Sequence, residues 1–137
     1  MSELPKTIKF EILTPQQKVY SAEISSVRLP GFDGYFGVHP GHTPYLAALK
    51  IGEIKVHIDD ITLYFATSGG FAEVLPDSVA VLAETAEPAD AIDVQRAMAA
   101  KERALKRIEE GSKVWDIDRA RAALSRAINR IQVASKI

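Results

Sequence analysis

The last fifty residues, 88–137, constrain the fold more than any other part of the chain. They predict two helices of similar length, at about 89–110 and 116–134, separated by a single break at Gly111-Ser112. A proline opens the segment, and aspartates follow in what would be the first turn, where negative charge is favourable. Two amphipathic helices joined by a short Gly-containing turn form an antiparallel hairpin. Because the segment is rich in alanine, the hairpin buries little side-chain surface and should be only marginally stable alone.

Each predicted helix carries an apolar stripe with helical spacing. The stripe of the second helix is continuous, whereas Lys101 interrupts that of the first helix. The second stripe consists of Ile117, Ala120, Leu124, Ala127, Ile128 and Ile131, and the first of Val94, Ala97, Met98, Ala104, Leu105 and Ile108. These two stripes are the expected contact between the helices.

Arginines form a further stripe on each helix. Spacings of seven and four residues place them on one face, as Arg96, Arg103 and Arg107 in the first helix and Arg119, Arg126 and Arg130 in the second. Folding the hairpin about residue 112 would bring Arg96 level with Arg126 and Arg130. The same fold would bring Arg103 level with Arg119 and Arg121.

This arginine pattern has two interpretations. Guanidinium groups brought together repel one another unless an anion lies between them, and their geometry suits phosphate oxygens. The pattern therefore indicates a polyanion site. Alternatively, the arginines form a solvated face with local pairs such as Asp93 with Arg96.

Composition narrows the class of protein. The chain has 137 residues and no cysteine, which excludes disulfides, thiolate metal sites and a cysteine nucleophile. Residues 1–87 hold 6 basic and 11 acidic side chains, a net charge of −5, whereas residues 88–137 hold 11 and 7, a net charge of +4. An acidic body with a basic arm is unsuited to nucleic acid. The absence of a signal pattern or an apolar run of membrane length predicts a cytoplasmic protein.

The first part of the chain shows strand patterns and no helix. Short alternating apolar segments follow one another between residues 7 and 83, with 30–34 expected as a loop and 19–29 as one long strand. The clearest hairpin is expected at 54–65, where two alternating runs flank Asp59-Asp60. This pattern predicts an antiparallel β sandwich or flattened barrel. We expect two domains, a β sandwich at 1–86 and a helical hairpin at 87–137.

Catalytic motifs are missing from the sequence. His39 and His42 flank Pro40-Gly41 and are the best candidate metal ligands, but no recognised metal motif contains them. Ser68-Gly69-Gly70 lies between strands, unlike a nucleophile elbow, and no phosphate-cradling glycine loop occurs. The sequence therefore argues against an enzyme, and no catalytic residue or catalytic cofactor is expected.

Two segments carry a family resemblance. Residues 34–52, Gly-Tyr-Phe-Gly-Val-His-Pro-Gly-His-Thr-Pro-Tyr-Leu-Ala-Ala-Leu-Lys-Ile-Gly, resemble the signature of the epsilon subunit of bacterial F-type ATP synthase. Residues 68–74, Ser-Gly-Gly-Phe-Ala-Glu-Val, resemble the second motif of that family. His39 and Tyr45 depart from the apolar residues expected at their positions.

The resemblance implies a ten-stranded sandwich followed by a helical hairpin, placed in the central stalk of a rotary motor. Its implied partners are the gamma subunit, the membrane c-ring and the α3β3 hexamer, with a peripheral location on the cytoplasmic face of the bacterial plasma membrane. The segment 32–44, expected as a loop, would contact the c-ring and gamma, through Phe32, Gly37, His39, Gly41 and His42. The hairpin would either pack on the sandwich or extend along gamma into the hexamer and oppose ATP hydrolysis.

Residues 92–97, Ile-Asp-Val-Gln-Arg-Ala, resemble the motif of those epsilon subunits that bind ATP on the folded hairpin. The resemblance carries over to eight residues: Glu87, Ile92, Asp93, Arg96, Ala97, Arg103, Arg126 and Arg130. The arginines would share the triphosphate charge, while Glu87 and Asp93 would orient Arg96 or accept hydrogen bonds from adenine or ribose. Ile92 and Ala97 would form an apolar wall for the base. ATP would thus be a regulatory ligand.

Three other functions are weighed against this one. The first is the same coupling and inhibitory subunit without nucleotide sensing, its arginines serving only as contacts to the hexamer. The second is a metal hydrolase built on His39 and His42. The third is a free-standing protein-binding module.

Overall fold

The structure, a computed structural model, describes residues 6–137. Residues 1–5 of the predicted first domain lie outside the described part. Ten strands come first, followed by a 3-10 helix η1 and helices α1 and α2. The strands are β1 (Ile8–Leu13), β2 (Lys18–Ile24), β3 (Ser26–Gly31), β4 (Gly34–Val38), β5 (Tyr45–Leu49), β6 (Gly52–Ile58), β7 (Ile61–Thr67), β8 (Gly70–Val74), β9 (Ser78–Ala83) and β10 (Ala86–Pro88), and the helices are η1 (Ala89–Ala91), α1 (Val94–Glu110) and α2 (Ile117–Ala134).

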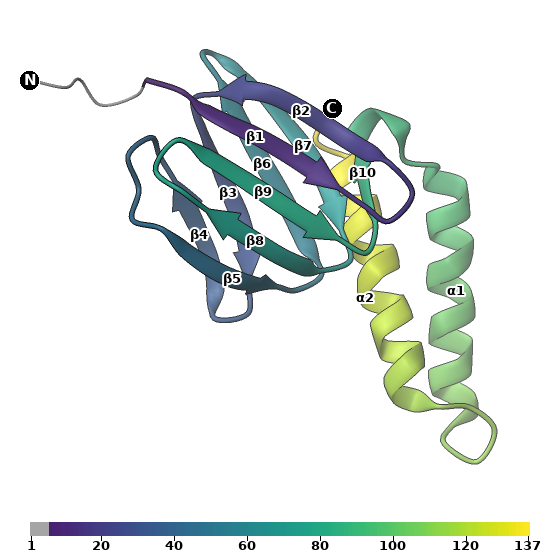
Figure 1. The fold of residues 1–137 in the computed structure, drawn as a ribbon. Helices are drawn as coiled ribbons and strands as arrows, with labels where there is room; N and C mark the ends of the chain where they lie inside the picture. Colours follow the sequence, from purple (N-terminus) through teal and green to yellow (C-terminus); the bar gives the residue numbers. More distant parts are fainter. Residues whose placement is uncertain (1–5) are drawn as a thin grey trace, which may run out of the picture.

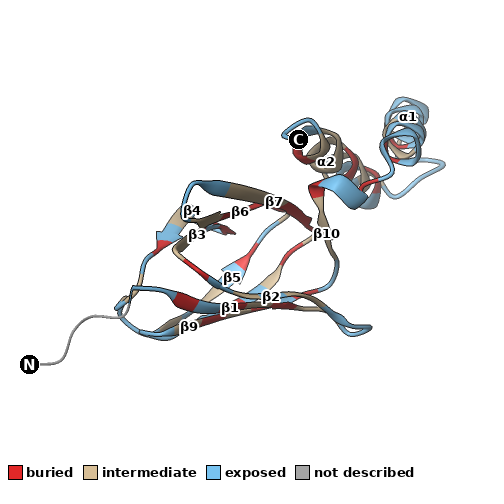
Figure 2. Cartoon of the chain, turned by 90° about the horizontal axis from the view of Figure 1, so that it is seen from above, coloured by how far each residue is buried: buried red, intermediate tan, exposed pale blue. Residues whose placement is uncertain are grey.

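One continuous sheet folds into two layers, with the helical hairpin at one side (Figures 1 and 2). The hydrogen-bonded order is β10-β7-β6-β3-β5-β8-β9-β1-β2, and β4 also pairs with β3. The predicted β sandwich with a C-terminal helical hairpin is confirmed. One pairing differs from the antiparallel pattern, because β1 and β9 run parallel to each other.

Alternation within the strands builds the core between the layers. Ile8, Phe10 and Ile12 of β1 have no exposed surface, while the residues between them face outward. The aromatic ring of Tyr20 packs between Phe10 and Phe65, with ring centroids 6.2 Å and 5.0 Å away. Burial raises the pKa of the Tyr20 phenol.

The hairpin predicted around Asp59-Asp60 is confirmed, because Ile58 pairs with Ile61 across it. Asp59 takes the left-handed backbone conformation (φ 53°), which aspartate tolerates better than most residues. Its backbone N–H donates to Ser25 Oγ at 2.9 Å, which links this turn to the break between β2 and β3.

Two strand predictions need correction. The expected single strand at 19–29 is two strands separated at Ser25. The expected loop at 30–34 is instead the tight end of a hairpin, because β3 continues through Pro30 to Gly31 and β4 starts at Gly34. Pro30 is accommodated there with its carbonyl oxygen accepting from Lys50 N–H.

The first long helix begins five residues later than predicted, at Val94 rather than Ala89. Residues 89–91 form η1, Ile92 is extended, and Asp93 caps α1 by accepting a hydrogen bond from Arg96 N–H at 3.0 Å. Pro88 stays in the sheet within β10, which pairs with β7. Among the described residues, no helix combines the length and apolar character needed to cross a membrane.

The hairpin is attached to the sandwich mainly through α2. Helix α2 packs on β6, β7 and η1, whereas α1 packs on α2 (Figure 1). Val133 is fully buried in a small cluster with Ala66, Ala89 and Ile92. The turn end of the hairpin projects beyond the sandwich (Figure 1).

Gly70→Ala should destabilise the sandwich strongly. A Cβ at this position would overlap the Leu82 carbonyl oxygen, and the backbone has a positive φ of 143°. We expect the free energy of unfolding to fall by about 3 kcal/mol or more, measured by urea denaturation. In Gly37→Ala, the added Cβ would meet only His39 Nε2 at 3.8 Å, so that variant should unfold like the wild type. Equal effects of the two substitutions would contradict this account of Gly70.

Candidate functional site

A groove of about 530 Å³ lies between the end of the sandwich and the helical hairpin. We call it the strand-side groove, because Thr85 and Glu87 from the β10 region form one wall. The other walls come from η1, the first half of α1 and one residue of α2. Its complete lining is Thr85, Glu87, Ala91, Asp93, Arg96, Ala97, Ala100, Arg103 and Arg130. Six of the eight residues predicted to bind ATP therefore line one groove.

The start of α1 positions two of these residues. Asp93 is exposed, but its carboxylate already accepts the N-cap hydrogen bond from the backbone N–H of Arg96. The Arg96 side chain lines the groove and forms no ion pair among the described residues. Ala97 is buried at the floor, where the absence of a longer side chain leaves the space open.

Glu87 and Arg130 form an ion pair across the groove. Arg130 Nε donates to Glu87 Oε1 at 2.6 Å, and each side chain is about one-third exposed. Glu87 was expected either to orient Arg96 or to accept hydrogen bonds from the ligand, and in this structure its partner is Arg130 rather than Arg96. Its role toward a ligand stays a prediction. Because both groups are partly solvated, the pair contributes no more than about 1 kcal/mol.

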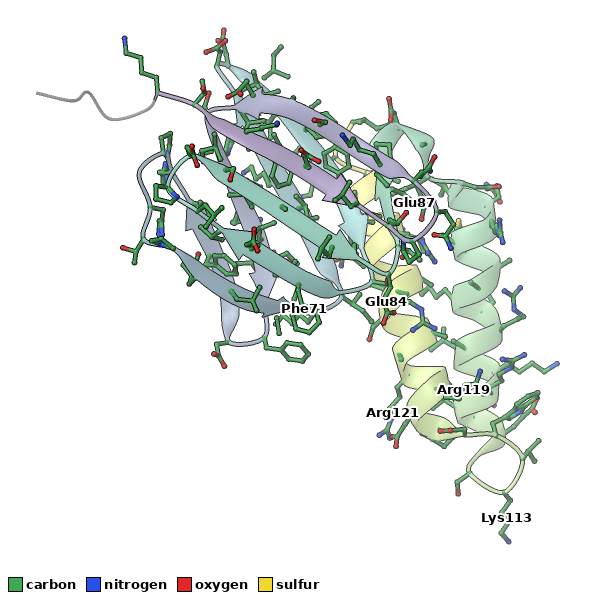
Figure 3. All side chains as sticks on the ribbon, in the orientation of Figure 1. Phe71, Glu84, Glu87, Lys113, Arg119 and Arg121 are labelled. Atoms are coloured by element: carbon green, nitrogen blue, oxygen red, sulfur yellow. The ribbon has the colours of Figure 1, made fainter. Side chains whose placement is uncertain are left out.

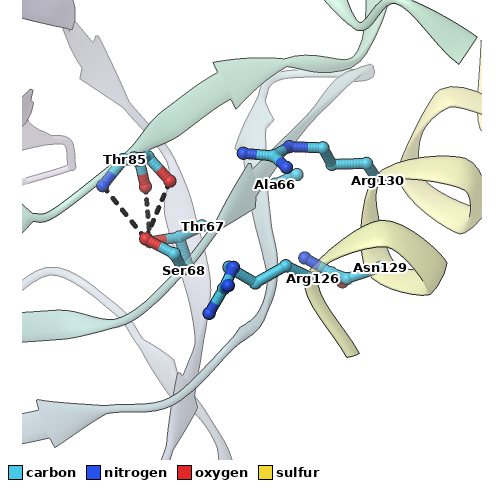
Figure 4. Close-up of a pocket in the computed structure, with 7 residues that line it drawn as sticks. All are labelled: Ala66, Thr67, Ser68, Thr85, Arg126, Asn129 and Arg130. Atoms are coloured by element: carbon cyan, nitrogen blue, oxygen red, sulfur yellow. Dashed lines mark hydrogen bonds between the residues drawn. The ribbon is translucent and has the colours of Figure 1, made fainter. Parts of the chain in front are cut away.

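Arg126 lies outside the strand-side groove. It extends from α2 toward the end of β7, beside Arg130 (Figure 4). The hydroxyls there are already satisfied, because Thr85 N–H and Thr85 Oγ1 both donate to Ser68 Oγ, at 3.1 Å and 2.7 Å. Arg126 also borders a second groove nearer the hairpin turn, with Arg107 and Arg119.

The predicted pairing levels of the arginines are partly wrong. Arg103 shares its groove with Arg130, and Arg119 shares the other with Arg107, while Arg121 lines neither. The turn occupies 111–116, so the two helices oppose each other about a point beyond residue 112. Arg121 follows Arg119 by about 200° around the helix and therefore points away from α1 (Figure 3).

Ile92 does not form a wall of the strand-side groove. It is 9 % exposed and packs in the cluster with Ala66, Ala89 and Val133. The predicted role of Ile92 as a wall for a base is therefore replaced by an anchoring role. This residue fixes the start of α1 to the sandwich and so determines where Asp93 and Arg96 lie.

The residues predicted to contact the c-ring and gamma fall into two places. Phe32 is 68 % exposed at the tip between β3 and β4. His39, Gly41 and His42 lie beyond the other end of β4, where Gly41 N–H donates to Pro76 O at 2.7 Å. Gly37 lies within β4 itself, so the expected single loop at 32–44 is a strand with a turn at each end.

The histidines of this region have ordinary structural contacts. The ring of His42 lies 5.3 Å from that of Tyr45, and its Nδ1 is 3.2 Å from Thr43 O. Burial raises the pKa of the Tyr45 phenol. Within residues 6–137, no three histidine, aspartate or glutamate side chains are grouped as metal ligands.

Comparison with known proteins identifies the family. Residues 7–89 match the family model of the ATP synthase delta/epsilon chain beta-sandwich domain, and residues 90–135 match that of the delta/epsilon chain long alpha-helix domain. The chain belongs to the ATP synthase delta/epsilon family. It is similar to the ATP synthase epsilon chains of Syntrophobacter fumaroxidans and Bacillus subtilis. The chain of Syntrophobacter fumaroxidans is 49% identical over 107 residues, which cover 78% of this chain and 80% of that one. The chain of Bacillus subtilis is 47% identical over 107 residues, which cover 78% of this chain and 81% of that one.

A solved structure supports the fold of this epsilon-family chain. A chain of the mitochondrial ATP synthase of Euglena gracilis superposes with a TM-score of 0.84 at 19% identity, covering 99% of this chain and 85% of that one. The predicted identity as an epsilon subunit of bacterial F-type ATP synthase is confirmed by the bacterial relatives. These comparisons do not test the predicted site residues, which remain a prediction.

Sequence reasoning missed Asn129, which connects the hairpin of this epsilon-family chain to its sandwich. Its amide Nδ2 donates to the Gly52 carbonyl oxygen at 2.8 Å, in a partly buried position. The sequence carries little signal for this role, because Asn129 is one of several polar residues of the second helix, with Asp118, Ser125 and Gln132. Its partner, a backbone carbonyl 77 residues earlier, could not be identified from the sequence.

Asn129→Ala should weaken the attachment of α2 without unfolding the sandwich. Loss of this hydrogen bond removes about 1 kcal/mol and leaves the Gly52 carbonyl unsatisfied. Amide hydrogen exchange in α2 should become several-fold faster, while exchange in β6 and β7 stays unchanged. Ser125→Ala replaces an exposed residue of the same helix and is the control. Unchanged exchange in α2 would mean that Asn129 does not hold the hairpin down.

Proposed function

We propose that this chain is the rotor subunit that couples gamma to the c-ring, and that its hairpin regulates ATP hydrolysis according to ATP concentration. The subunit is non-catalytic in this proposal, and ATP is its regulatory ligand. The proposed response to ATP is supported by the elements that form the walls of the strand-side groove. Its walls come from the β10 region, α1 and α2, so the groove exists only while the hairpin is folded on the sandwich.

The charge of the groove supports a phosphate ligand. Arg96 and Arg103 have no carboxylate within ion-pair distance among the described residues, and Arg130 has only Glu87. Bound triphosphate would compete with Glu87 for Arg130 and place its charge between guanidiniums from both helices. Asp93 and Glu87 would then be available as acceptors for the adenine amino group or the ribose.

The mechanism is a shift between two populations. A ligand that binds only the folded hairpin stabilises it by RT ln(1 + [ATP]/Kd), about 2.7 kcal/mol at a hundredfold excess over Kd. The free energy that attaches α2 to the sandwich is of similar size, because it depends on Val133, one amide hydrogen bond and one partly exposed ion pair. High ATP would keep the hairpin folded, and low ATP would release it.

The released hairpin has an unpartnered apolar face. Val94, Met98 and Leu105 of α1 are 38 %, 49 % and 42 % exposed and lie about half a turn around the helix from Arg96 and Arg103. Such a face can be buried against another subunit once the hairpin extends. The basic charge of the segment suits acidic surfaces of the hexamer.

A second apolar surface, on the sandwich, supports docking to gamma. Leu46, Phe71 and Leu82 are 70 %, 54 % and 53 % exposed on the neighbouring strands β5, β8 and β9. Phe71 is paired directly with Leu82 and points away from the core (Figure 3). A cluster of large apolar side chains on a flat sheet is typical of a protein interface.

Arg103→Ala should weaken ATP binding about tenfold or more, measured by calorimetry on the whole chain. The substitution removes an exposed cation that lines the strand-side groove and does not line the groove near the hairpin turn. Arg121→Ala removes the same charge from an exposed position that lines neither groove and should bind like the wild type. No heat with millimolar ATP in the wild type would eliminate sensing and leave the coupling and inhibitory subunit without nucleotide response.

Phe71→Glu should weaken binding to purified gamma subunit by about tenfold or more, because it introduces a charge at the centre of the apolar surface. Binding can be measured by biolayer interferometry, with circular dichroism as a check of the fold. Ile61→Glu is the matched control, because Ile61 is 60 % exposed at the tip between β6 and β7. If both variants bind gamma equally well, the surface on β5, β8 and β9 is not the gamma interface.

A further inference from the structure

A second groove, of about 410 Å³, lies between the two helices at the hairpin turn. We call it the turn groove. It shares no lining residue with the strand-side groove, and the part of the hairpin that carries it projects beyond the sandwich (Figure 1). Its charged walls are Arg107, Arg119 and Arg126, and its floor is formed by Ala120 and Ala123.

The turn groove has an excess of positive charge. Its single carboxylate, Asp116, accepts the N-cap hydrogen bond from Arg119 N–H at 3.2 Å. The ion pairs found among residues 6–137 involve Lys18, Arg28 and Arg130, so the three arginines of the turn groove have no carboxylate partner. Three guanidiniums around one space repel one another and would be stabilised by a bound anion.

Trp115 gives this groove a flat apolar surface. Its indole N–H donates to Glu110 Oε2 at 2.7 Å, and the Arg107 guanidinium lies 4.3 Å from the ring centroid. The preceding turn is closed by hydrogen bonds from Val114 N–H and Trp115 N–H to Gly111 O. The ring is therefore held in place, and it remains 37 % exposed.

We propose that the turn groove is a second ligand site, which takes a nucleotide. A flat base would lie against Trp115 and the alanine floor, and its phosphates would be bound by Arg119 and Arg126, with Arg107 nearby. The apolar floor distinguishes this class of ligand from inorganic phosphate, which would use only the arginines. This site is additional to the proposed regulatory ATP site and does not depend on it.

The test uses the two-dimensional nitrogen–proton spectrum of the whole chain, titrated with ATP. Trp115 is the single tryptophan, so its indole N–H gives one resolved signal in the turn groove, and the Ala97 amide reports on the strand-side groove. The indole signal should shift saturably in the wild type and in Arg103→Ala. In Arg119→Ala the apparent Kd from the indole signal should rise about tenfold or more, with the Ala97 response retained.

Arg121→Ala is the matched control, because it removes the same charge two residues away, outside both grooves. Tripolyphosphate, which has no ring, should bind the turn groove at least about tenfold more weakly than ATP. An indole signal that does not move with millimolar ATP would overturn the proposal, as would equal behaviour of Arg119→Ala and Arg121→Ala. Equal affinity for tripolyphosphate and ATP would overturn the assignment to nucleotides. Loss of the Ala97 response alone would count against the regulatory site and leave the turn groove standing.

Discussion

The attachment of α2 to the sandwich is the interaction on which the rest of the regulatory segment depends. It consists of Val133 in a small apolar cluster, the Asn129 amide on the Gly52 carbonyl, and the ion pair of Arg130 with Glu87. Burial of one valine contributes about 1.5–3 kcal/mol, the hydrogen bond about 1 kcal/mol, and the partly exposed ion pair less than that. Each of these terms is small compared with the entropy of ordering two helices, so the folded hairpin can be shifted by a ligand of ordinary affinity.

Alanine determines what lies between the helices. The residues buried in the two helices, apart from Val133, are Ala97 and Ala104 of α1 and Ala120 and Ala127 of α2, which allow the helices to lie close together while leaving one groove open beside the sandwich and another at the turn. The larger apolar residues of the two stripes remain partly exposed, as Met98 and Leu105 show. The same choice of residue therefore makes the hairpin weak, makes space for a ligand, and leaves an apolar face available to another subunit.

Much of this architecture follows from the sequence, and the exceptions have physical causes. Alternation and turn residues predicted the strands and the hairpin at Asp59, because both are local signals. The parallel pairing of β1 with β9 was not predictable in this way, since it joins residues about seventy positions apart. Helix α1 was placed too early because Pro88 and Asp90 are typical of a helix start and alanine has high helix propensity, yet Ile92 is extended and packs on the sandwich.

In the candidate site, too, local features were predictable from the sequence and features that depend on tertiary contacts were not. Helical spacing placed the arginines correctly on one face of each helix, since that depends only on periodicity. The length of the turn determines which arginines share a groove. The partner of Glu87 depends on how β10 packs against α2. Neither feature could be predicted from the sequence of one helix alone. The acidic sandwich and the basic hairpin attract each other, yet Glu87–Arg130 is the single ion pair that joins them among the described residues. Most of this attraction is therefore long-range and screened by salt, which leaves the remaining arginines free to respond to a bound anion.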